Sequence, residues 1–238
     1  PKLQEDPTLF YDNILGCSYW SLQGEITKAV FEHMRTSVAS CHGIGKSYIS
    51  ARLVLAFIFA FPNSIVVTTA PTWRQVENII WREINSAYSM SKVNLGGRML
   101  KTQFEIADKW YAMGISSNKP DNMQGIHGEH VLVIADEAAG IEDDILNVME
   151  ALLTSKNVHL LYIGNPTKGD GNFYKSHKDM SFKKFKISIF DTPNFKYNKI
   201  QSLADLQAFE NEDELANLPL PYPELVTPLW AYGRMQSW

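Results

Sequence analysis

Residues Ser40-Cys-His-Gly-Ile-Gly-Lys-Ser47 form the stretch that decides the expected fold, because they follow a short strand pattern and open an apolar helix. The stretch fits the phosphate-binding loop pattern G-x-x-x-x-G-K-[ST], except that Ser40 replaces the first glycine. Gly43 and Gly45 let backbone N–H groups turn inward around an anion, and the helix N-terminus adds a favourable dipole. The stretch predicts nucleotide binding, against the alternative of a glycine-rich turn with a chance Lys-Ser pair.

Two side chains at the end of this loop suit a bound nucleoside phosphate. Lys46 can reach the β- and γ-phosphates, and the Ser47 hydroxyl can ligate Mg²⁺. The residues expected to contact the nucleotide are Ser40, Cys41, His42, Gly43, Ile44, Gly45, Lys46 and Ser47.

A second signal is Val131-Leu-Val-Ile-Ala-Asp136-Glu137, an apolar strand pattern that leads into two acids. A buried parallel strand that delivers a carboxylate at its carboxyl end matches a Walker B element. Asp136 is expected to hold Mg²⁺, and Glu137 to orient or deprotonate an attacking water. The adjacent Asp-Glu pair favours hydrolysis over transfer to an organic acceptor.

A third strand pattern, Val158–Gly164, runs into Gly164-Asn-Pro-Thr167. If this strand neighbours the Walker B strand, Asn165 or Thr167 lies beside the γ-phosphate and can sense hydrolysis. The alternative is a plain Asn-Pro turn.

The rest of the chain alternates between strand and helix patterns, which predicts a mostly parallel sheet flanked by helices. The expected strands are Thr36–Ser40, Ser64–Thr69, Phe104–Met113, Val131–Ala135, Val158–Ile163 and Phe185–Phe190. The expected helices are Ser47–Phe61, a segment around Trp73–Ile84, Ile141–Leu153 and Leu203–Glu214.

Composition places the chain among ordinary globular proteins. Its 238 residues carry 22 Lys+Arg and 26 Asp+Glu, a net charge of −4, which excludes a strongly basic nucleic-acid coat protein. Its 2 cysteines cannot form a disulfide framework, so a reducing cytoplasm is the default compartment. The longest apolar run, Leu53–Phe61, is shorter than the roughly 20 residues of a membrane span, so no membrane partner is expected.

The composition shifts near Asp191-Thr-Pro-Asn194, which predicts a core over residues 1–190 and a small subdomain over 191–238. Residues 168–186 contain six Lys and two Asp, a charge of 6 − 2 = +4. Residues 200–238 contain one Arg and six acids, a charge of 1 − 6 = −5. The alternative to an acidic subdomain after a basic patch is two unrelated solvated faces.

Two further patterns are interpreted as coincidences. Asn118-Lys-Pro-Asp121 matches a guanine-recognition pattern, but it precedes the Walker B strand instead of following it. His127-Gly-Glu-His130 offers two histidines without a third ligand nearby, which is more typical of a structural role than of a metal site.

In their order and spacing, these motifs resemble the N-terminal ATPase domain of the large terminase subunit, the genome-packaging motor of tailed bacteriophages. The matching segments are Trp20-Ser-Leu-Gln23, Val38–Ser47, Thr69-Ala-Pro-Thr72, Met123-Gln-Gly-Ile-His127, Gly164-Asn-Pro-Thr167 and Asp191-Thr-Pro-Asn194. The resemblance implies a P-loop NTPase of the additional-strand type, with Gln23 contacting adenine and a lid that begins near Asp191.

The resemblance also implies a function: hydrolysis of ATP, with Mg²⁺, to push double-stranded DNA into a procapsid. The expected partners are DNA, a homo-oligomeric ring on a portal and a small terminase subunit, in the cytoplasm of an infected bacterium. An arginine supplied in cis or in trans is expected to stabilise the transition state. The candidates for it are Arg35, Arg52, Arg74, Arg82 and Arg98.

The chain departs from this family pattern in three respects. Cys41 and His42 stand where several relatives have an arginine, and Gln124 stands where others have one. The carboxylate cluster of the family's nuclease domain is absent, so no DNA cleavage is expected. The chain starts at Pro1 without Met and is expected to be a piece of a longer protein.

Three other functions are considered. A helicase-like or DNA-remodelling ATPase would share the same motifs without packaging DNA. A small-molecule kinase is disfavoured by Glu137. A nucleotide-gated binding protein would bind without useful turnover.

Overall fold

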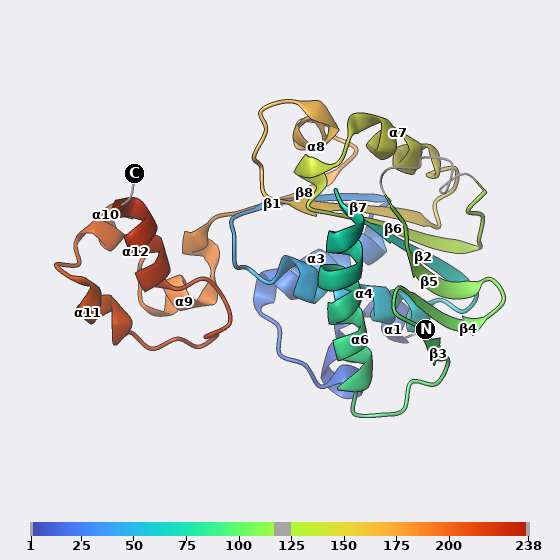
Figure 1. Cartoon of the computed structure of the whole chain (residues 1–238), viewed down its shortest axis with the longest axis horizontal. Helices are drawn as coiled ribbons and strands as arrows, with labels where there is room; N and C mark the ends of the chain where they lie inside the picture. Colours follow the sequence, from blue (N-terminus) through green and yellow to red (C-terminus); the bar gives the residue numbers. More distant parts are fainter. Residues whose placement is uncertain (1, 117–124, 237–238) are drawn as a thin grey trace. The chain divides into compact units, whose positions relative to one another are not determined.

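The structure is a computed structural model that describes residues 2–116 and 125–236 (Figure 1). It divides into two compact units. The first comprises Pro1–Ala39 and Lys46–Phe185, and the second comprises Ser40–Gly45 and Lys186–Trp238. The phosphate-loop segment Ser40–Gly45 therefore groups with the C-terminal residues, although it joins a strand to a helix of the first unit.

The first unit is built on a mixed sheet, eight-stranded in the described residues, with the order β3-β4-β5-β2-β6-β7-β1-β8. The five strands β5, β2, β6, β7 and β1 run parallel to one another. At one edge, β4 pairs antiparallel with both β3 and β5. The strands are β1 Arg35–Ser40, β2 Ser64–Thr69, β3 Arg98–Met99, β4 Gln103–Ala107, β5 Trp110–Gly114, β6 His130–Asp136, β7 Val158–Gly164 and β8 Lys183–Ile187.

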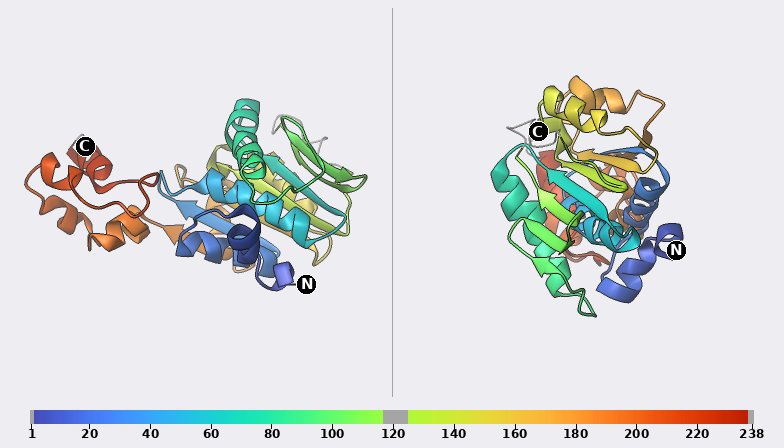
Figure 2. Two further views of the ribbon diagram at one scale, coloured as in Figure 1. Left: turned by 90° about the horizontal axis from the view of Figure 1, so that it is seen from below. Right: turned by 90° about the vertical axis from the view of Figure 1, so that its right-hand side faces the viewer.

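Helices cover both faces of this sheet. Figure 2 shows α7 and α8 on one face and the N-terminal helices with α4 and α6 on the other. They are α1 Lys2–Glu5, α2 Thr8–Phe10, α3 Ser21–Glu32, α4 Lys46–Ala60, α5 Trp73–Gln75, α6 Trp81–Ser89, α7 Asp143–Ala151 and α8 Gly171–Ser176. The predicted mostly parallel α/β architecture is confirmed. None of the helices in the described ranges is long and apolar enough to cross a membrane.

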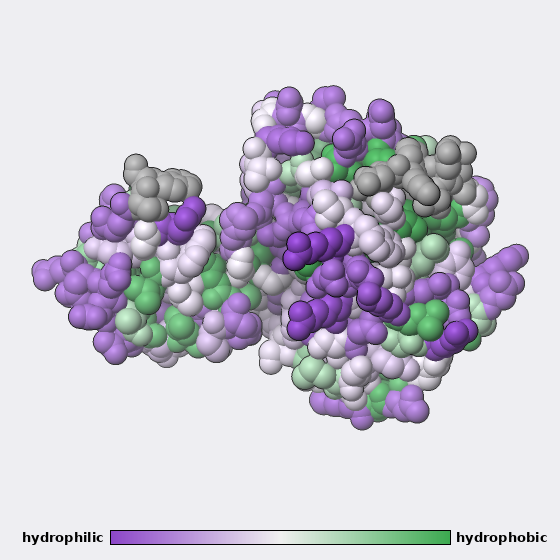
Figure 3. Space-filling view, in the orientation of Figure 1, coloured by the Kyte–Doolittle hydropathy of each residue, from purple (hydrophilic) through white to green (hydrophobic). Residues whose placement is uncertain are grey.

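The apolar segment predicted as a core helix forms α4, which is buried along nearly its whole length. On the other side of the sheet, alternate residues of β6 and β7 pack against Leu146 and Met149 of α7 and Phe173 of α8. By contrast, the outer side of the helical segment that runs from α5 through α6 is hydrophilic (Figure 3). This difference follows from the sequence of the segment, because Arg74, Asn78 and Arg82 recur at helical spacing and are exposed.

Among its described residues, the second unit has four short α-helices and its own apolar core. They are α9 Pro193–Tyr197, α10 Leu203–Gln207, α11 Glu212–Ala216 and α12 Pro228–Gln236. Phe195, Leu206, Leu215 and Tyr232 are among the buried residues that pack together. The interpretation of residues 191–238 as a lid stays a prediction.

Two predicted strands are wrong at their boundaries. Phe104–Met113 is not one strand but the β4–β5 hairpin, which turns where Lys109 adopts a left-handed backbone with φ 59°. The charged pair Asp108-Lys109 marks this turn in the sequence, and the prediction of one continuous strand overlooked it. The last strand is Lys183–Ile187 and not Phe185–Phe190, because a 3-10 turn begins at Ile189.

The predicted single helix Leu203–Glu214 is also wrong. The Ser202 hydroxyl accepts a hydrogen bond from the Asp205 N–H (3.2 Å), and Asn211 Oδ1 accepts one from the Glu214 N–H (3.1 Å). Each bond caps a separate helix, α10 or α11, so the second cap interrupts the pattern. Pro228 begins α12, because a proline fits the first turn of a helix.

Candidate nucleotide site

The candidate site of the first unit lies where three elements begin or end. Strands β6 and β7 are adjacent and parallel, with Asp136 paired to Ile163, so Asp136, Glu137 and Asn165 emerge at the same sheet edge. Helix α4 begins at Lys46. The carboxyl edge of a parallel sheet is where α/β proteins place their ligands, because side chains of neighbouring strand ends converge there.

Lys46 is the centre of the polar contacts at this edge. Its Nζ donates a hydrogen bond to Asn165 Oδ1 at 2.6 Å and lies 3.6 Å from Glu137 Oε1. Lys46 and Asn165 are each only 7% exposed. A buried ammonium needs polar partners of this kind. The structure thus brings together three residues that were singled out separately from the sequence.

Ser47 and Asp136 form a second pair. The Ser47 hydroxyl donates to Asp136 Oδ2 at 3.0 Å, and the Glu137 N–H donates to Asp136 Oδ1 at 3.2 Å. Burial, followed by the nearby Glu137 carboxylate, raises the pKa of Asp136 to about 6. A buried carboxylate beside a hydroxyl supplies the oxygen ligands that Mg²⁺ prefers, and a cation would offset the cost of burying its charge. These residues therefore fit the expected metal.

Glu137 occupies an uncommon backbone conformation, with φ 51° and ψ 46° in the left-handed region. Residues other than glycine rarely adopt it, and such positions cluster at functional sites. The Glu137 side chain is 36% exposed and so can meet a solvent-borne ligand.

Gly164, the last residue of β7, fits closely against this turn. A Cβ atom on Gly164 would lie 2.9 Å from Ala138 N and 3.2 Å from Glu137 Cα. Both contacts are with backbone, so a side chain at position 164 would displace the Glu137 turn. In the sequence, the only sign of this close approach between Gly164 and the Glu137–Ala138 backbone is the glycine of the Gly-Asn-Pro motif.

The predicted phosphate loop belongs to the second unit and is held there by backbone hydrogen bonds. The Cys41 N–H donates to Ile187 O at 3.0 Å, and the Val226 N–H donates to Gly43 O at 2.8 Å. Gly43 and Gly45 have φ of 68° and 78°, the left-handed region that favours glycine. Ser40 and Ile44 are buried, whereas His42 and Gly43 are exposed.

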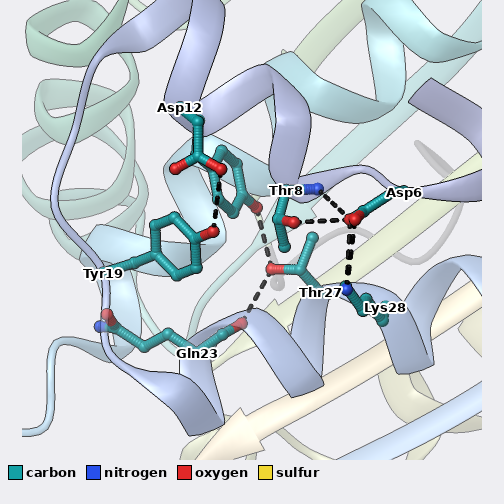
Figure 4. Close-up of polar contacts among 8 residues, drawn as sticks. Asp6, Thr8, Asp12, Tyr19, Gln23, Thr27 and Lys28 are labelled. Atoms are coloured by element: carbon teal, nitrogen blue, oxygen red, sulfur yellow. Dashed lines mark hydrogen bonds and ion pairs between the residues drawn. The ribbon is translucent and has the colours of Figure 1, made fainter. Parts of the chain in front are cut away.

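Gln23, the expected adenine contact, is buried in the first turn of α3. Its Oε1 accepts a hydrogen bond from the Trp20 N–H at 3.2 Å, and its backbone carbonyl accepts one from the Thr27 hydroxyl at 2.9 Å. Figure 4 shows this region, where Tyr11 also contacts Thr27 and Asp6 links Thr8 to Lys28. The N-terminal segment is thereby fixed onto α3. The adenine role of Gln23 stays a prediction.

Thr167 is exposed, and its N–H donates to Asn165 O at 2.9 Å. It therefore belongs to the turn that carries Asn165, and its sensor role stays a prediction.

Of the candidate arginines, Arg52 is buried, and its Nη1 lies 2.9 Å from Glu83 Oε2. Its guanidinium also lies over the Tyr48 ring at 3.3 Å. These contacts give Arg52 a structural role, and they would have to break before it could stabilise a transition state. Arg74, Arg82 and Arg98 are exposed.

Of the guanine-recognition pattern and the histidine pair, only the histidine pair lies within the described residues. Asn118–Asp121 and the segment with Met123 and Gln124 lie outside the described residues. His130 stacks on Phe61 with the ring centroids 4.5 Å apart. Within residues 2–116 and 125–236, no group of three or more His, Cys, Asp or Glu side chains could hold a metal ion.

The fold and the site define the class first. A mostly parallel sheet whose adjacent strands deliver Asp136, Glu137 and Asn165 toward the lysine that begins α4 is the P-loop NTPase fold. No family model matches the chain.

Known phage proteins are similar to this chain in sequence and in fold. A protein of Enterobacteria phage P7 described as a probable terminase, large subunit, is 33% identical over 159 residues, which is 62% of this chain and 32% of that protein. The chain thus spans about a third of the length of this curated relative. The Thermus phage P74-26 large terminase ATPase domain superposes with a TM-score of 0.65 at 19% identity, covering 86% of this chain and 93% of that one. The large terminase of bacteriophage D6E in complex with ADP gives a TM-score of 0.55 at 13% identity, covering 76% of this chain and 49% of that one.

The chain is therefore a homologue of a phage large terminase subunit and has the fold of the large terminase ATPase domain. The resemblance indicated by the motifs is confirmed. The roles of the individual site residues stay predictions.

Proposed function

We propose that the chain is the ATPase domain of a large terminase subunit and hydrolyses ATP to move viral double-stranded DNA into a procapsid. The observation that carries this proposal is the cluster at the sheet edge, where Lys46 meets Asn165 and Glu137 beside the Ser47–Asp136 pair. ATP hydrolysis requires groups that bind phosphate, groups that bind the metal ion and a general base.

Each residue has a definite part in this proposal. Backbone N–H groups of the Ser40–Gly45 loop bind phosphate oxygens. Lys46 exchanges its contacts with Asn165 and Glu137 for the β- and γ-phosphates. Ser47 and Asp136 would hold Mg²⁺, which supplies charge neutralisation when bound.

The exchange at Lys46 releases two groups for the reaction. Glu137, no longer next to the ammonium, accepts a proton from the attacking water. The Asn165 amide becomes able to contact the γ-phosphate, so that loss of this phosphate on hydrolysis can change the position of the end of β7. This is the coupling role we propose for Asn165 and Thr167.

DNA is the proposed substrate of the motor, contacted through phosphates. The exposed lysines of the basic segment, residues 168–186, include Lys168, Lys175, Lys178 and Lys183. Lysines that contact phosphates bind without reading sequence and depend strongly on salt. We also propose a homo-oligomeric ring on the procapsid portal, a small terminase subunit as partner and the cytoplasm of the infected cell as location.

A helicase-like or DNA-remodelling ATPase remains the alternative with the same site chemistry. The P7 relative, described as a terminase, favours packaging over this alternative. Stimulation of ATP hydrolysis by linear double-stranded DNA rather than by single strands would support the packaging motor.

Nucleotide binding is tested first by Lys46→Ala. Since the buried ammonium is the proposed phosphate contact, we expect the dissociation constant of a fluorescent ATP analogue to rise by about a hundredfold. Lys156→Ala, which changes an exposed lysine on the loop before β7, is the matched control and should bind normally. Equal affinity of Lys46→Ala and the unmodified chain would remove the site assignment.

A further inference from the structure

The shape of the phosphate loop depends on a segment far away in the sequence. The Val226 N–H donates to Gly43 O at 2.8 Å. A Cβ atom on Gly43 would lie 3.1 Å from Val226 Cβ and 3.2 Å from Val226 N, so the two backbones are also in close contact. Any displacement of Val226 would therefore move the loop at Gly43.

One buried side chain fixes the segment Tyr222–Val226. Asn194 is fully buried, at 0% exposure. Its Nδ2 donates to Tyr222 O at 2.7 Å and to Val226 O at 3.1 Å, and its Oδ1 accepts from the Tyr222 N–H at 3.0 Å. Loss of this buried amide would remove all three hydrogen bonds at once, which is costly. Asn194 thus holds both ends of Tyr222–Val226 in place.

We propose that Asn194 is a positioning residue for the phosphate loop. By fixing Tyr222–Val226, it keeps the Val226 N–H on Gly43 O and so keeps the loop N–H groups in the arrangement that binds a nucleoside phosphate. Asn194 acts through Val226 and does not itself contact the nucleotide. Only the identity of the ligand rests on the proposed function.

The decisive variant is Asn194→Asp. It preserves the size of the side chain and the acceptor for the Tyr222 N–H, but it places a carboxylate oxygen against the carbonyls of Tyr222 and Val226. Asn198→Asp is the matched control. Asn198 Nδ2 also donates to two carbonyls, Asn194 O at 2.7 Å and Pro219 O at 2.9 Å, and both lie outside Tyr222–Val226.

The first readout is amide hydrogen exchange of residues 40–45 without nucleotide. We expect faster exchange in Asn194→Asp and wild-type exchange in Asn198→Asp. The second readout is the affinity for a fluorescent ADP analogue, which should fall by about tenfold or more in Asn194→Asp only. Unchanged loop exchange in folded Asn194→Asp, or the same rise in both variants, would overturn the proposal.

Two further outcomes are separated by design. If Asn194→Asp does not fold, Val226→Pro removes the N–H that meets Gly43 and keeps the carbonyls that Asn194 binds; exchange of residues 40–45 must then rise, and unchanged exchange overturns the proposal. A wild-type chain that fails to bind ADP would contradict the proposed function alone, because loop exchange is measured without nucleotide.

Discussion

Glu137 illustrates at the scale of one residue how the site constrains its surroundings. Its left-handed backbone, at φ 51°, costs on the order of 1 kcal/mol in a residue with a side chain, and the fold must offset that cost. Gly164, the last residue of β7, helps to accommodate this conformation because it leaves room for the Glu137–Ala138 peptide. The turn that aims the proposed base thus depends on a neighbouring residue that has no side chain.

We therefore expect Gly164→Ala to lower kcat for ATP hydrolysis by about tenfold to a hundredfold, because small displacements of a base are costly. The KM for ATP should change much less, since Lys46 and the phosphate loop are not altered. Steady-state kinetics gives both values. Gly169→Ala is the control, because a Cβ there meets nothing within 4 Å. A Gly164→Ala enzyme with normal kcat would show that the turn tolerates the shift.

At the scale of elements, His159 ties the first residues of β7 to two helices. Its Nδ1 lies 3.1 Å from the carbonyl of His33, the residue that follows α3, and its ring meets Phe57 of α4 edge-on at 5.7 Å. Burial lowers the pKa of His159 below 6.5 despite its backbone hydrogen bonds, and His130 lowers it further. The folded chain therefore binds this proton less readily than the unfolded chain.

The sign of the pH effect follows from this difference. As pH falls through 6.5, the unfolded state takes up a proton that folded His159 resists, so the free energy of unfolding decreases toward acid. We expect the free energy of unfolding, measured with urea, to fall less between pH 7.5 and pH 5.5 in His159→Asn than in wild type. Asparagine keeps an N–H donor but does not titrate. The exposed His127→Asn should lose as much as wild type. Equal losses in all three proteins would contradict this role of His159.

The motif-bearing elements could be predicted from the sequence, whereas several others could not. The proximity of Asp136, Glu137 and Asn165 could be predicted from the strand patterns. Neighbouring parallel strands end at the same edge of the sheet, so the residues at and just after their ends lie close together. The β4–β5 turn depends on the left-handed backbone of Lys109, and the gap between α10 and α11 depends on a helix cap. Hydrophobic periodicity predicts neither feature. The hold of Asn194 on Tyr222–Val226 arises only from tertiary pairing.

At the scale of the whole molecule, we expect electrostatic attraction to dominate the binding of DNA. The net charge is −4, so attraction must come from a locally basic segment, and residues 168–186, with six Lys and two Asp, are the one we propose. Raising salt from about 50 to 200 mM should weaken binding of linear double-stranded DNA, with a slope set by the number of phosphates neutralised. Exchanging both Lys175 and Lys183 for alanine should reduce that slope by about two.

Fluorescence anisotropy of labelled duplexes over this salt range measures the slope directly. Two duplexes of unrelated sequence should give the same affinity, because phosphates carry no base identity. Lys156→Ala is again the matched control. Salt-independent binding, or a strong preference for one sequence, would exclude this surface as the contact.

The central claim, that the cluster around Lys46 hydrolyses ATP, is tested most directly by Mg-ATP turnover at high protein concentration, with Glu137→Gln as the blank. We expect turnover by the wild-type chain that rises with linear double-stranded DNA. In Glu137→Gln it should fall by about a hundredfold or more while ATP binding persists, since the amide cannot accept the proton. Undiminished turnover in Glu137→Gln, or a wild-type rate no higher than this blank, would contradict the account.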